Sequence, residues 1–108
     1  MSDEPSTELD DDLAVMRRED RHAYVATLAD LEVATVQYER SDERLVLLTT
    51  TVIPAYRGRG ISDELIAYAL DDIRRRSERI TVLCPVVKAF LERYPENLDL
   101  VDASRPDY

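Results

Sequence analysis

Both glycines of this 108-residue chain fall in one run, Val52-Ile53-Pro54-Ala55-Tyr56-Arg57-Gly58-Arg59-Gly60-Ile61-Ser62. The apolar, β-branched residues 44–52 predict a strand, and the apolar spacing that begins at Ile61 predicts an amphipathic helix. The glycines therefore occupy a strand-to-helix turn, where the missing Cβ lets the backbone approach a ligand closely. The free N–H groups and the dipole at the start of the helix favour an anion, and Arg57 and Arg59 add positive charge.

The motif around these glycines is not that of a nucleotide triphosphate site. A P-loop requires Lys and then Ser or Thr after its last glycine, whereas this chain has Ile61-Ser62. A dinucleotide fold requires a third glycine and a βαβ frame, whereas several predicted strands precede this turn. The spacing Arg-x-x-Gly-x-small, filled by Arg57, Gly60 and Ser62, instead resembles the acetyl-CoA pyrophosphate loop of the GNAT acyltransferase superfamily.

The resemblance extends to other segments of the chain. It is carried by Ala34-Thr35-Val36-Gln37-Tyr38, Thr81-Val82-Leu83-Cys84-Pro85 and Ala89-Phe90-Leu91-Glu92-Arg93-Tyr94-Pro95. Together these segments look like a small, single-domain GNAT-like family with a Cys after its fifth strand, and the similarity covers roughly residues 15–101. The resemblance implies acetyl-CoA as cosubstrate, an amine as acceptor, N-acetyl transfer as the reaction, and no metal.

The resemblance also implies where acetyl-CoA lies. In the superfamily the fourth and fifth strands splay apart, and the pantetheine arm binds in the gap along the backbone of the fourth strand. On this sequence the arm would lie along Thr50, Thr51 and Val52, with the Val52 N–H near the thioester carbonyl. The pyrophosphate would be held by Arg57, Gly58, Arg59, Gly60, Ile61 and Ser62.

Two residues are candidates for the chemistry of transfer. Cys84 follows the fifth predicted strand, beside the expected thioester, where its thiol could accept the acetyl group or protonate CoA; the alternative is a buried Cys that packs as a small hydrophobe. Tyr94 is a weaker candidate for the general acid, because the helix position that often carries a Tyr in the superfamily has Phe90 here. The single His, His22, is expected on the surface. Related sequences commonly have a His where this chain has Thr49.

The order of predicted elements gives the fold class. Alternating or continuous apolar runs predict strands at residues 13–17, 22–28, 31–39, 44–52 and 79–83, with a short last strand at 98–101. Helices are predicted from Ile61 and over residues 86–94, the second ended by Pro95. This pattern predicts an α+β fold with a GNAT-like mixed, mostly antiparallel sheet of five to six strands and two main helices.

The first helix has an apolar stripe for one face of the sheet. The stripe is formed by Ile61, Leu65, Ile66, Ala69, Leu70 and Ile73. Asp63, Glu64, Asp71 and Asp72 are predicted to point to solvent. The run Arg74-Arg75-Arg76 is expected to complement the helix dipole rather than to bind a partner.

Composition limits the function classes. The net charge is −9, and 14 basic residues face 23 acidic ones, so nucleic acid would be repelled. Thirteen of the basic residues are Arg and one is Lys88, a halophile-like pattern. No apolar run has the length of a membrane span, no secretory signal is evident, and the lone Cys84 makes no internal disulfide. We expect a cytoplasmic protein with a disordered acidic tail at 1–12 and one domain at 13–108.

The acceptor and the oligomeric state stay open. The helices that normally wall the acceptor site have no room between Arg18 and Ala23, so an open cleft is expected. The acidic surface favours a cationic acceptor, and a polypeptide is compatible with the cleft. Monomer and homodimer are both compatible with the sequence. Three functions remain: an N-acyltransferase, a catalytically silent CoA-binding module, or an interaction domain in which the glycines only shape a turn.

Overall fold

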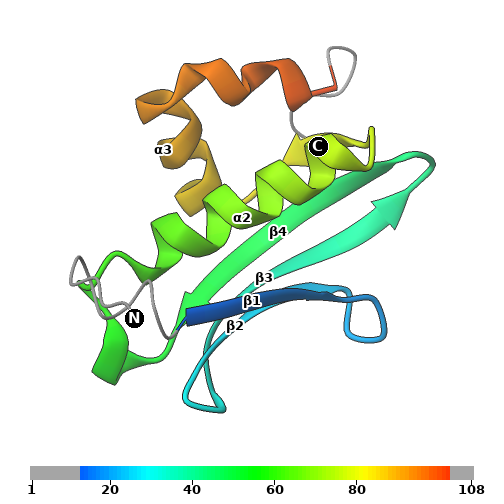
Figure 1. Ribbon diagram of the computed structural model, residues 1–108. Helices are drawn as coiled ribbons and strands as arrows, with labels where there is room; N and C mark the ends of the chain where they lie inside the picture. The colour runs from blue at the N-terminus through cyan, green and yellow to red at the C-terminus, as the bar shows by residue number, and fades with distance from the viewer. Residues whose placement is uncertain (1–12, 103–108) are drawn as a thin grey trace.

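The computed structural model describes residues 13–102, and the predicted tail at 1–12 and the last six residues lie outside the described part. Five strands form one sheet in the order β1-β2-β3-β4-β5. The elements are β1 (Leu13–Arg18), β2 (Ala23–Leu28), β3 (Leu31–Ser41), β4 (Arg44–Val52), η1 (Pro54–Tyr56), α2 (Ile61–Arg75), β5 (Arg79–Val82), α3 (Pro85–Arg93) and η2 (Pro95–Leu100). The predicted α+β fold is confirmed (Figure 1).

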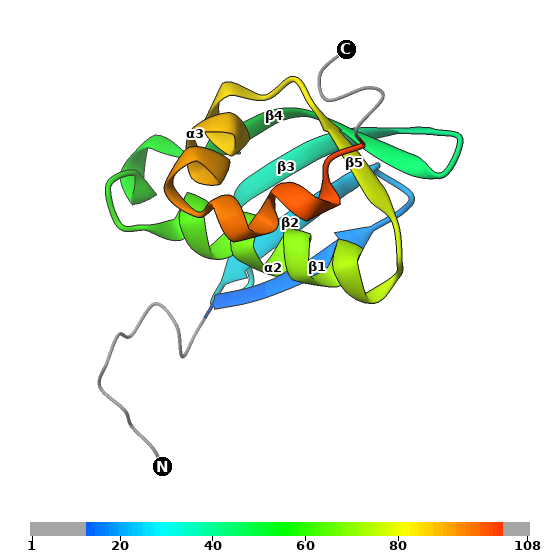
Figure 2. The same cartoon turned by 90° about the horizontal axis from the view of Figure 1, so that it is seen from above.

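The first four strands form an antiparallel meander. Its connections are tight turns with left-handed residues: His22, Ala29, Asp30 and Asp42 all have positive φ. These short polar turns keep neighbouring strands adjacent, as the spacing of the apolar runs indicated. β5 then returns parallel to β4 after the α2 crossover, so β4 and β5 are the parallel pair of this sheet (Figure 2).

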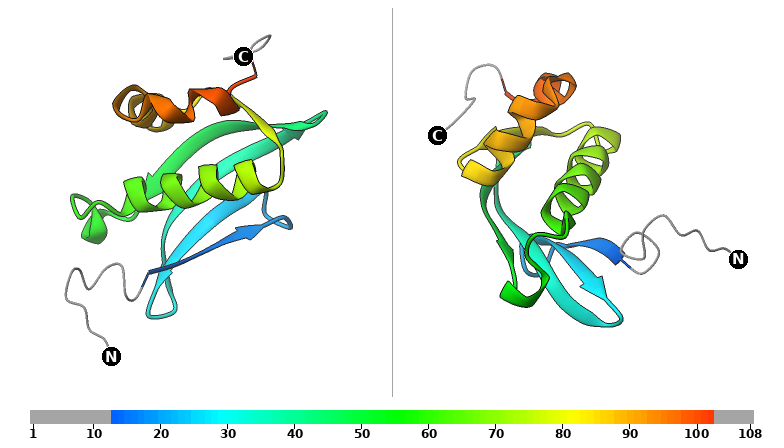
Figure 3. Two further views of the ribbon diagram at one scale, coloured as in Figure 1. Left: turned by 45° about the horizontal axis from the view of Figure 1, so that its top comes forward. Right: turned by 90° about the vertical axis from the view of Figure 1, so that its left-hand side faces the viewer.

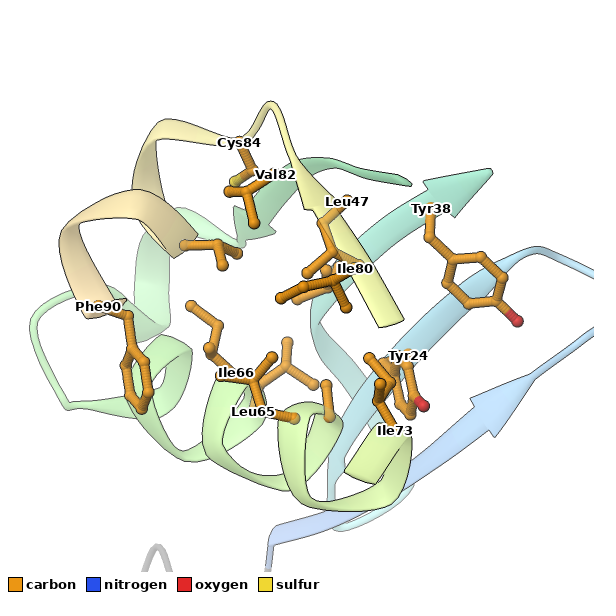
Figure 4. Packing of buried hydrophobic residues seen from close by; sticks show 14 of the residues in the cluster. Tyr24, Tyr38, Leu47, Leu65, Ile66, Ile73, Ile80, Val82, Cys84 and Phe90 are labelled. Carbon is orange, nitrogen blue, oxygen red and sulfur yellow. The ribbon is translucent and has the colours of Figure 1, made fainter. Parts of the chain in front are cut away.

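Helix α2 packs its apolar stripe on the sheet. All six predicted residues are buried, and they join Tyr24, Val36, Leu45 and Leu47 in one core (Figure 4). The prediction that Asp72 points to solvent is wrong. Asp72 is buried, and its Oδ2 accepts a 2.7 Å hydrogen bond from the Tyr24 hydroxyl. The periodicity placed Asp72 at the edge of the stripe, where a partner on β2 draws it inward.

The chain after β5 completes the core at the sheet edge. Val87, Phe90 and Leu91 of α3 pack into the same cluster as α2. The predicted strand at 98–101 is replaced by η2 and by a single parallel bridge between Val101 and Ile80. Pro95 explains the difference, because it fits the first position of a helical turn.

The two helices lie on one side of the sheet (Figure 3). The backbone pairing places Thr35 opposite Thr51 and Gln37 opposite Thr49, and the β3 residues next to Thr35 and Gln37 belong to the core. These four side chains therefore project from the other face. Within residues 13–102, no helix covers that face. The connection between β1 and β2 is too short to hold a helix, as expected from the sequence.

Candidate functional site

The sheet opens at one point, between the carboxyl halves of β4 and β5. The parallel pairing runs from Arg44 and Arg79 to Leu47 and Val82, and no further pair is formed. The N–H groups of Leu83 and Cys84 both donate to the Leu47 carbonyl, at 2.9 and 3.0 Å. The predicted splay is therefore present, and it begins after Leu47.

A bulge in β4 accompanies the opening. Gln37 of β3 pairs with Thr49 and Tyr38 pairs with Leu47, so Leu48 has no residue opposite it. An extra residue in one strand bends that strand and increases its twist, which turns the end of β4 away from β5. The sequence carried no signal for this bulge, because Leu48 continues an apolar run without interruption.

Backbone donors of β4 face the opening. The Ile53 N–H donates to the Val33 carbonyl of β3 at 2.9 Å, and N–H groups alternate in direction along a strand. The N–H groups of Thr50 and Val52 therefore point to the side that β5 has left. This is the geometry that an extended, amide-containing ligand needs in order to bind as an additional strand.

The loop after β4 has the conformation that its glycines predict. Gly58 and Gly60 both have a φ of 80°, and Gly60 is the N-cap of α2. A Cβ built on either glycine meets no atom within 4 Å, so protein packing does not demand the glycines. The first intrahelical bond joins the Glu64 N–H to the Gly60 carbonyl, so the three preceding N–H groups point out of the helix end.

The two loop arginines have different roles in this conformation. The Arg57 Nε–H donates to the Val52 carbonyl at 3.0 Å, which ties the loop back to the end of β4. The Arg59 guanidinium lies 5.0 Å from the centre of the Tyr56 ring. Both arginine side chains are exposed beside the start of α2. In the first turn of α2, Ile61 is buried and Ser62 is half-buried.

The structure brings Thr50 and Cys84 together across the opening. The Thr50 Oγ1 and the Cys84 Sγ lie 3.2 Å apart, and Cys84 is the N-cap of α3. The Cys84 side chain has no solvent exposure (Figure 4). The thiol is thus buried beside the end of β4, in contact with Thr50.

Tyr94 lies at the other end of α3. It follows the last residue of the helix, about 15 Å from Cys84 along the helix axis at 1.5 Å per residue. Its ring packs 4.8 Å from that of Phe90 and is 40% exposed. His22 stacks on Tyr38 at 5.8 Å, in the turn between β1 and β2.

A groove joins the glycine loop to the end of α3. It encloses about 610 Å³ between α2, α3 and η2, and Gly60, Phe90 and Tyr94 are among its lining residues. Arg93 of α3 crosses its end and forms a bidentate ion pair with Asp63 in the first turn of α2, at 2.9 and 3.0 Å. No local pattern predicts this pair, since the two residues are 30 positions apart.

A family model described as GCN5-related N-acetyl-transferase matches residues 23–100, which run from β2 to the end of η2. The chain belongs to the GCN5-related N-acetyltransferase family. The matched range contains the opened strand pair, the glycine loop and Cys84. It confirms the family that the loop spacing and the Cys after the fifth strand indicated.

One curated relative extends the comparison of this GCN5-related N-acetyltransferase domain. Protein NATD1 of Bos taurus is 38% identical over 63 residues, which are 57% of this chain. The chain spans 56% of the length of that relative. The family normally binds acetyl-CoA, and the residues predicted to bind it here stay predictions.

Residues 13–102 contain neither a cluster of metal ligands nor a helix suited to span a membrane. In that range no group of three or more His, Cys, Asp or Glu side chains is placed to hold a metal ion. None of the helices of the described range has the length and apolar character needed to cross a bilayer.

Proposed function

We propose that this GCN5-related N-acetyltransferase domain is an acetyl-CoA-dependent N-acyltransferase that moves an acetyl group to an amine. The observation that carries the proposal is the opening between β4 and β5 after Leu47, with the glycine loop at its mouth. In open sheets, ligands bind beyond the carboxyl ends of parallel strands. Family membership supplies the ligand class.

The residues at the opening fit this ligand. The N–H groups of Thr50 and Val52 are directed at the gap, where amide groups of a pantetheine arm would accept and return hydrogen bonds. The start of α2 offers outward N–H groups and a positive dipole end for a pyrophosphate. The open space at Gly60 leaves room for close approach, because no protein atom lies where a Cβ would stand.

Bound acetyl-CoA would supply a thioester-activated acetyl group. In our proposal the Val52 N–H stabilises negative charge that develops on the carbonyl oxygen, since a preorganised backbone donor acts strongly at a site shielded from water. In direct transfer the amine nitrogen would bond to the acetyl carbon as the carbon–sulfur bond breaks, the Cys84 thiol would protonate the departing CoA thiolate, and the resulting Cys84 thiolate would take the proton that the amine releases. In two-step transfer Cys84 would first take the acetyl group, its proton passing to the CoA thiolate, and would then pass the acetyl group to the amine and regain a proton. The Thr50 hydroxyl, 3.2 Å from the Cys84 sulfur, would orient the thiol. An amine acceptor enters as the neutral base, and a cationic or polypeptide acceptor suits the acidic surface.

A second function is favoured by specific observations. Thr49 stands where related sequences commonly have a His, and the Cys84 thiol is fully buried. Tyr94 lies at the far end of α3 from Cys84. A chain without a placed base would bind CoA and not turn it over, as a catalytically silent CoA-binding module.

Thermal unfolding separates binding from no binding. We expect saturating acetyl-CoA to raise the midpoint by several degrees, since a ligand at about a hundred times its Kd adds about 2.7 kcal/mol. ADP is the control for non-specific nucleotide binding. If acetyl-CoA left the midpoint of thermal unfolding unchanged, the acyltransferase and the silent CoA-binding module would both be rejected as functions. The interaction domain would then be the remaining candidate.

Thiol release in an amine screen separates the two CoA-binding functions. Release of free CoA with lysine peptides, polyamines or small amines supports the acyltransferase, and binding without release supports the silent module. The variant Cys84→Ala is expected to bind CoA normally and to lose turnover. Full turnover in this variant would return Cys84 to a packing role.

A further inference from the structure

The groove beside the glycine loop is rich in negative charge. Its lining includes Asp63, Glu64, Asp71 and Glu96, and Arg74 is the basic residue among its lining side chains within residues 13–102. Arg74 is engaged with Asp99, at 2.6 and 3.1 Å. A phosphate-bearing ligand at the Gly60 end therefore meets Arg57 and Arg59 on the loop side and carboxylates on the groove side, and the repulsion from the groove side opposes binding unless it is compensated.

Asp63, like Glu64, is a groove carboxylate in the first turn of α2, where such a ligand would bind. The helix dipole stabilises a negative charge in that turn. An anion at the outward N–H groups of the same turn would use the same positive potential. Two anions in one helix turn repel each other unless one of them is neutralised.

Arg93 neutralises Asp63 from the neighbouring helix. Its two terminal nitrogens bind both carboxylate oxygens of Asp63, and its guanidinium lies 5.9 and 5.4 Å from the Phe90 and Tyr94 ring centres. A planar guanidinium held by two rings and two hydrogen bonds is fixed in position. The hydrogen bonds from Arg93 lower the pKa of Asp63, so the carboxyl group is charged and paired at neutral pH.

We propose that Arg93 is a positioning residue that raises the affinity of the glycine loop for the pyrophosphate of acetyl-CoA. By holding Asp63 in an ion pair, it removes the repulsion that this carboxylate would exert on the pyrophosphate at the start of α2. The inference rests on the proposed function, because it assumes that acetyl-CoA binds at the glycine loop. Arg93 acts through Asp63 and does not itself contact the ligand.

A double-mutant cycle tests this inference. The Kd for CoA is measured at low ionic strength for the wild type, Arg93→Ala, Asp63→Asn and the double variant. We expect Arg93→Ala to weaken binding about fivefold, because it exposes a carboxylate near a multiply charged ligand. Asp63→Asn should bind at least as tightly as the wild type, and Arg93→Ala should have no further effect in the Asp63→Asn background. The loss should shrink in high salt.

Two controls distinguish charge compensation from a structural role. Pantetheine, which lacks phosphate, should bind all four proteins equally. Arg21→Ala removes a bidentate arginine of the same kind, paired with Glu32 at 2.9 and 2.7 Å, and neither residue lines the groove. It changes net charge by the same amount, and it should leave the Kd for CoA unchanged.

Several results would overturn the inference. An equal loss from Arg93→Ala in both backgrounds would mean that Arg93 contacts the phosphate directly. Weaker pantetheine binding in Arg93→Ala would mean that the ion pair only supports the shape of the groove. If the wild type binds CoA but the cycle shows no coupling between Arg93 and Asp63, this inference alone is refuted. If the wild type does not bind CoA, the proposed function is refuted and the inference with it.

Discussion

The two ends of α2 use charge in opposite ways. At the carboxyl end, charged and polar side chains of β1, β2 and the last turn of α2 bind one another. At the amino end, the exposed glycine loop leaves backbone N–H groups directed outward, and the nearby Asp63 carboxylate is paired from another helix. The same helix thus has one end committed to the fold and one end open to a ligand.

Arg17 of β1 is the centre of the carboxyl-end cluster. Its side chain is 2% exposed and binds Glu78 at 2.8 and 3.2 Å. It also donates to the Tyr24 hydroxyl at 3.2 Å, and the same hydroxyl donates to Asp72. Its Nε lies 2.9 Å from Glu19 in an ion pair that lacks hydrogen-bond alignment. The cluster therefore ties β1 and β2 to the last turn of α2.

The comparison teaches that stability and binding are separable along this helix. Changes at the Arg17 cluster should alter the free energy of unfolding and leave ligand affinity under native conditions unchanged. Changes at the glycine loop should mainly alter ligand affinity, with a smaller cost in stability where a left-handed glycine is replaced. The predictions that follow test this separation, from the largest expected effect to the smallest.

The largest effect is expected from Arg17→Ala. Removing Arg17 leaves Glu78 with the 3.4 Å bond from Arg40 and Asp72 with Tyr24 and Arg76. The expected loss is therefore about 3 kcal/mol, at the low end for breaking a buried charge cluster. Urea unfolding measures the change. Arg40→Ala is the matched control, because Arg40 binds the same Glu78 carboxylate at 3.4 Å from an exposed position and should cost under about 1 kcal/mol. Equal losses in the two variants would contradict the central role of Arg17.

The next effect is on binding, in Gly60→Val. The new Cβ should occupy the space left for the pyrophosphate and weaken CoA binding about a hundredfold, or about 2.7 kcal/mol. The left-handed backbone at Gly60 costs a non-glycine residue about 1–2 kcal/mol of stability. Gly58→Val is the comparison within the loop, because Gly58 has the same φ of 80° but lies two residues before the helix end, so it should weaken CoA binding less. If both variants lost CoA equally, the backbone of the loop rather than close approach at Gly60 would be responsible.

The fold was predictable because its signals are local. The strand at residues 44–52 and the helix that begins at Ile61 were predicted at the bounds observed, since apolar pattern and glycine placement mark both. The positive φ of both glycines follows from the same turn. The last strand was predicted wrongly, because a short apolar run at 98–101 does not distinguish a strand from a helical turn.

The site was predictable only in part, because its contacts are not local. The resemblance pointed to Cys84 and Thr50 separately. Their contact follows a bulge at Leu48 that no local sequence pattern predicts. The Arg17 cluster joins residues up to 61 positions apart, and the Asp63–Arg93 pair spans 30. Asp72 was placed in solvent because helical periodicity describes a face and cannot show a partner on another strand.

A smaller loss of stability is expected from Tyr24→Phe. The change removes the hydroxyl that donates to Asp72 at 2.7 Å and accepts from Arg17, and a hydrogen bond to a charged group is worth about 1.5–3 kcal/mol. Tyr38→Phe is the control, because the Tyr38 hydroxyl reaches Glu19 only at 3.5 Å. Chemical unfolding should show a clear loss for Tyr24→Phe and almost none for Tyr38→Phe. A loss of the same size in both would mean that the bond to Asp72 has no special weight, and no loss in Tyr24→Phe would place the stabilisation in the aromatic ring.

The last prediction concerns how the free energy of unfolding depends on pH, an effect that is smallest near neutral pH. Burial alone would raise the pKa of Asp72, but hydrogen bonds from Tyr24 and Arg76 outweigh it and lower the pKa. A carboxyl group with a lowered pKa in the folded state stabilises the fold fully above its unfolded pKa near 4, and this contribution is lost as pH falls through the folded value. Unfolding free energy should therefore be level from pH 7 to about 5 and decline below about 4.

Two isosteric variants assign that decline to one end of α2. Asp72→Asn should lower stability at neutral pH and flatten the acid decline, because its carboxylate is buried in the Arg17 cluster. Asp63 also has a lowered pKa, through its hydrogen bonds with Arg93, but its side chain is 40% exposed. Solvent screens such a pair, so Asp63→Asn should change the acid decline much less. A steeper dependence on Asp63 than on Asp72 would mean that the amino end of α2, and not the carboxyl end, holds the helix on the sheet.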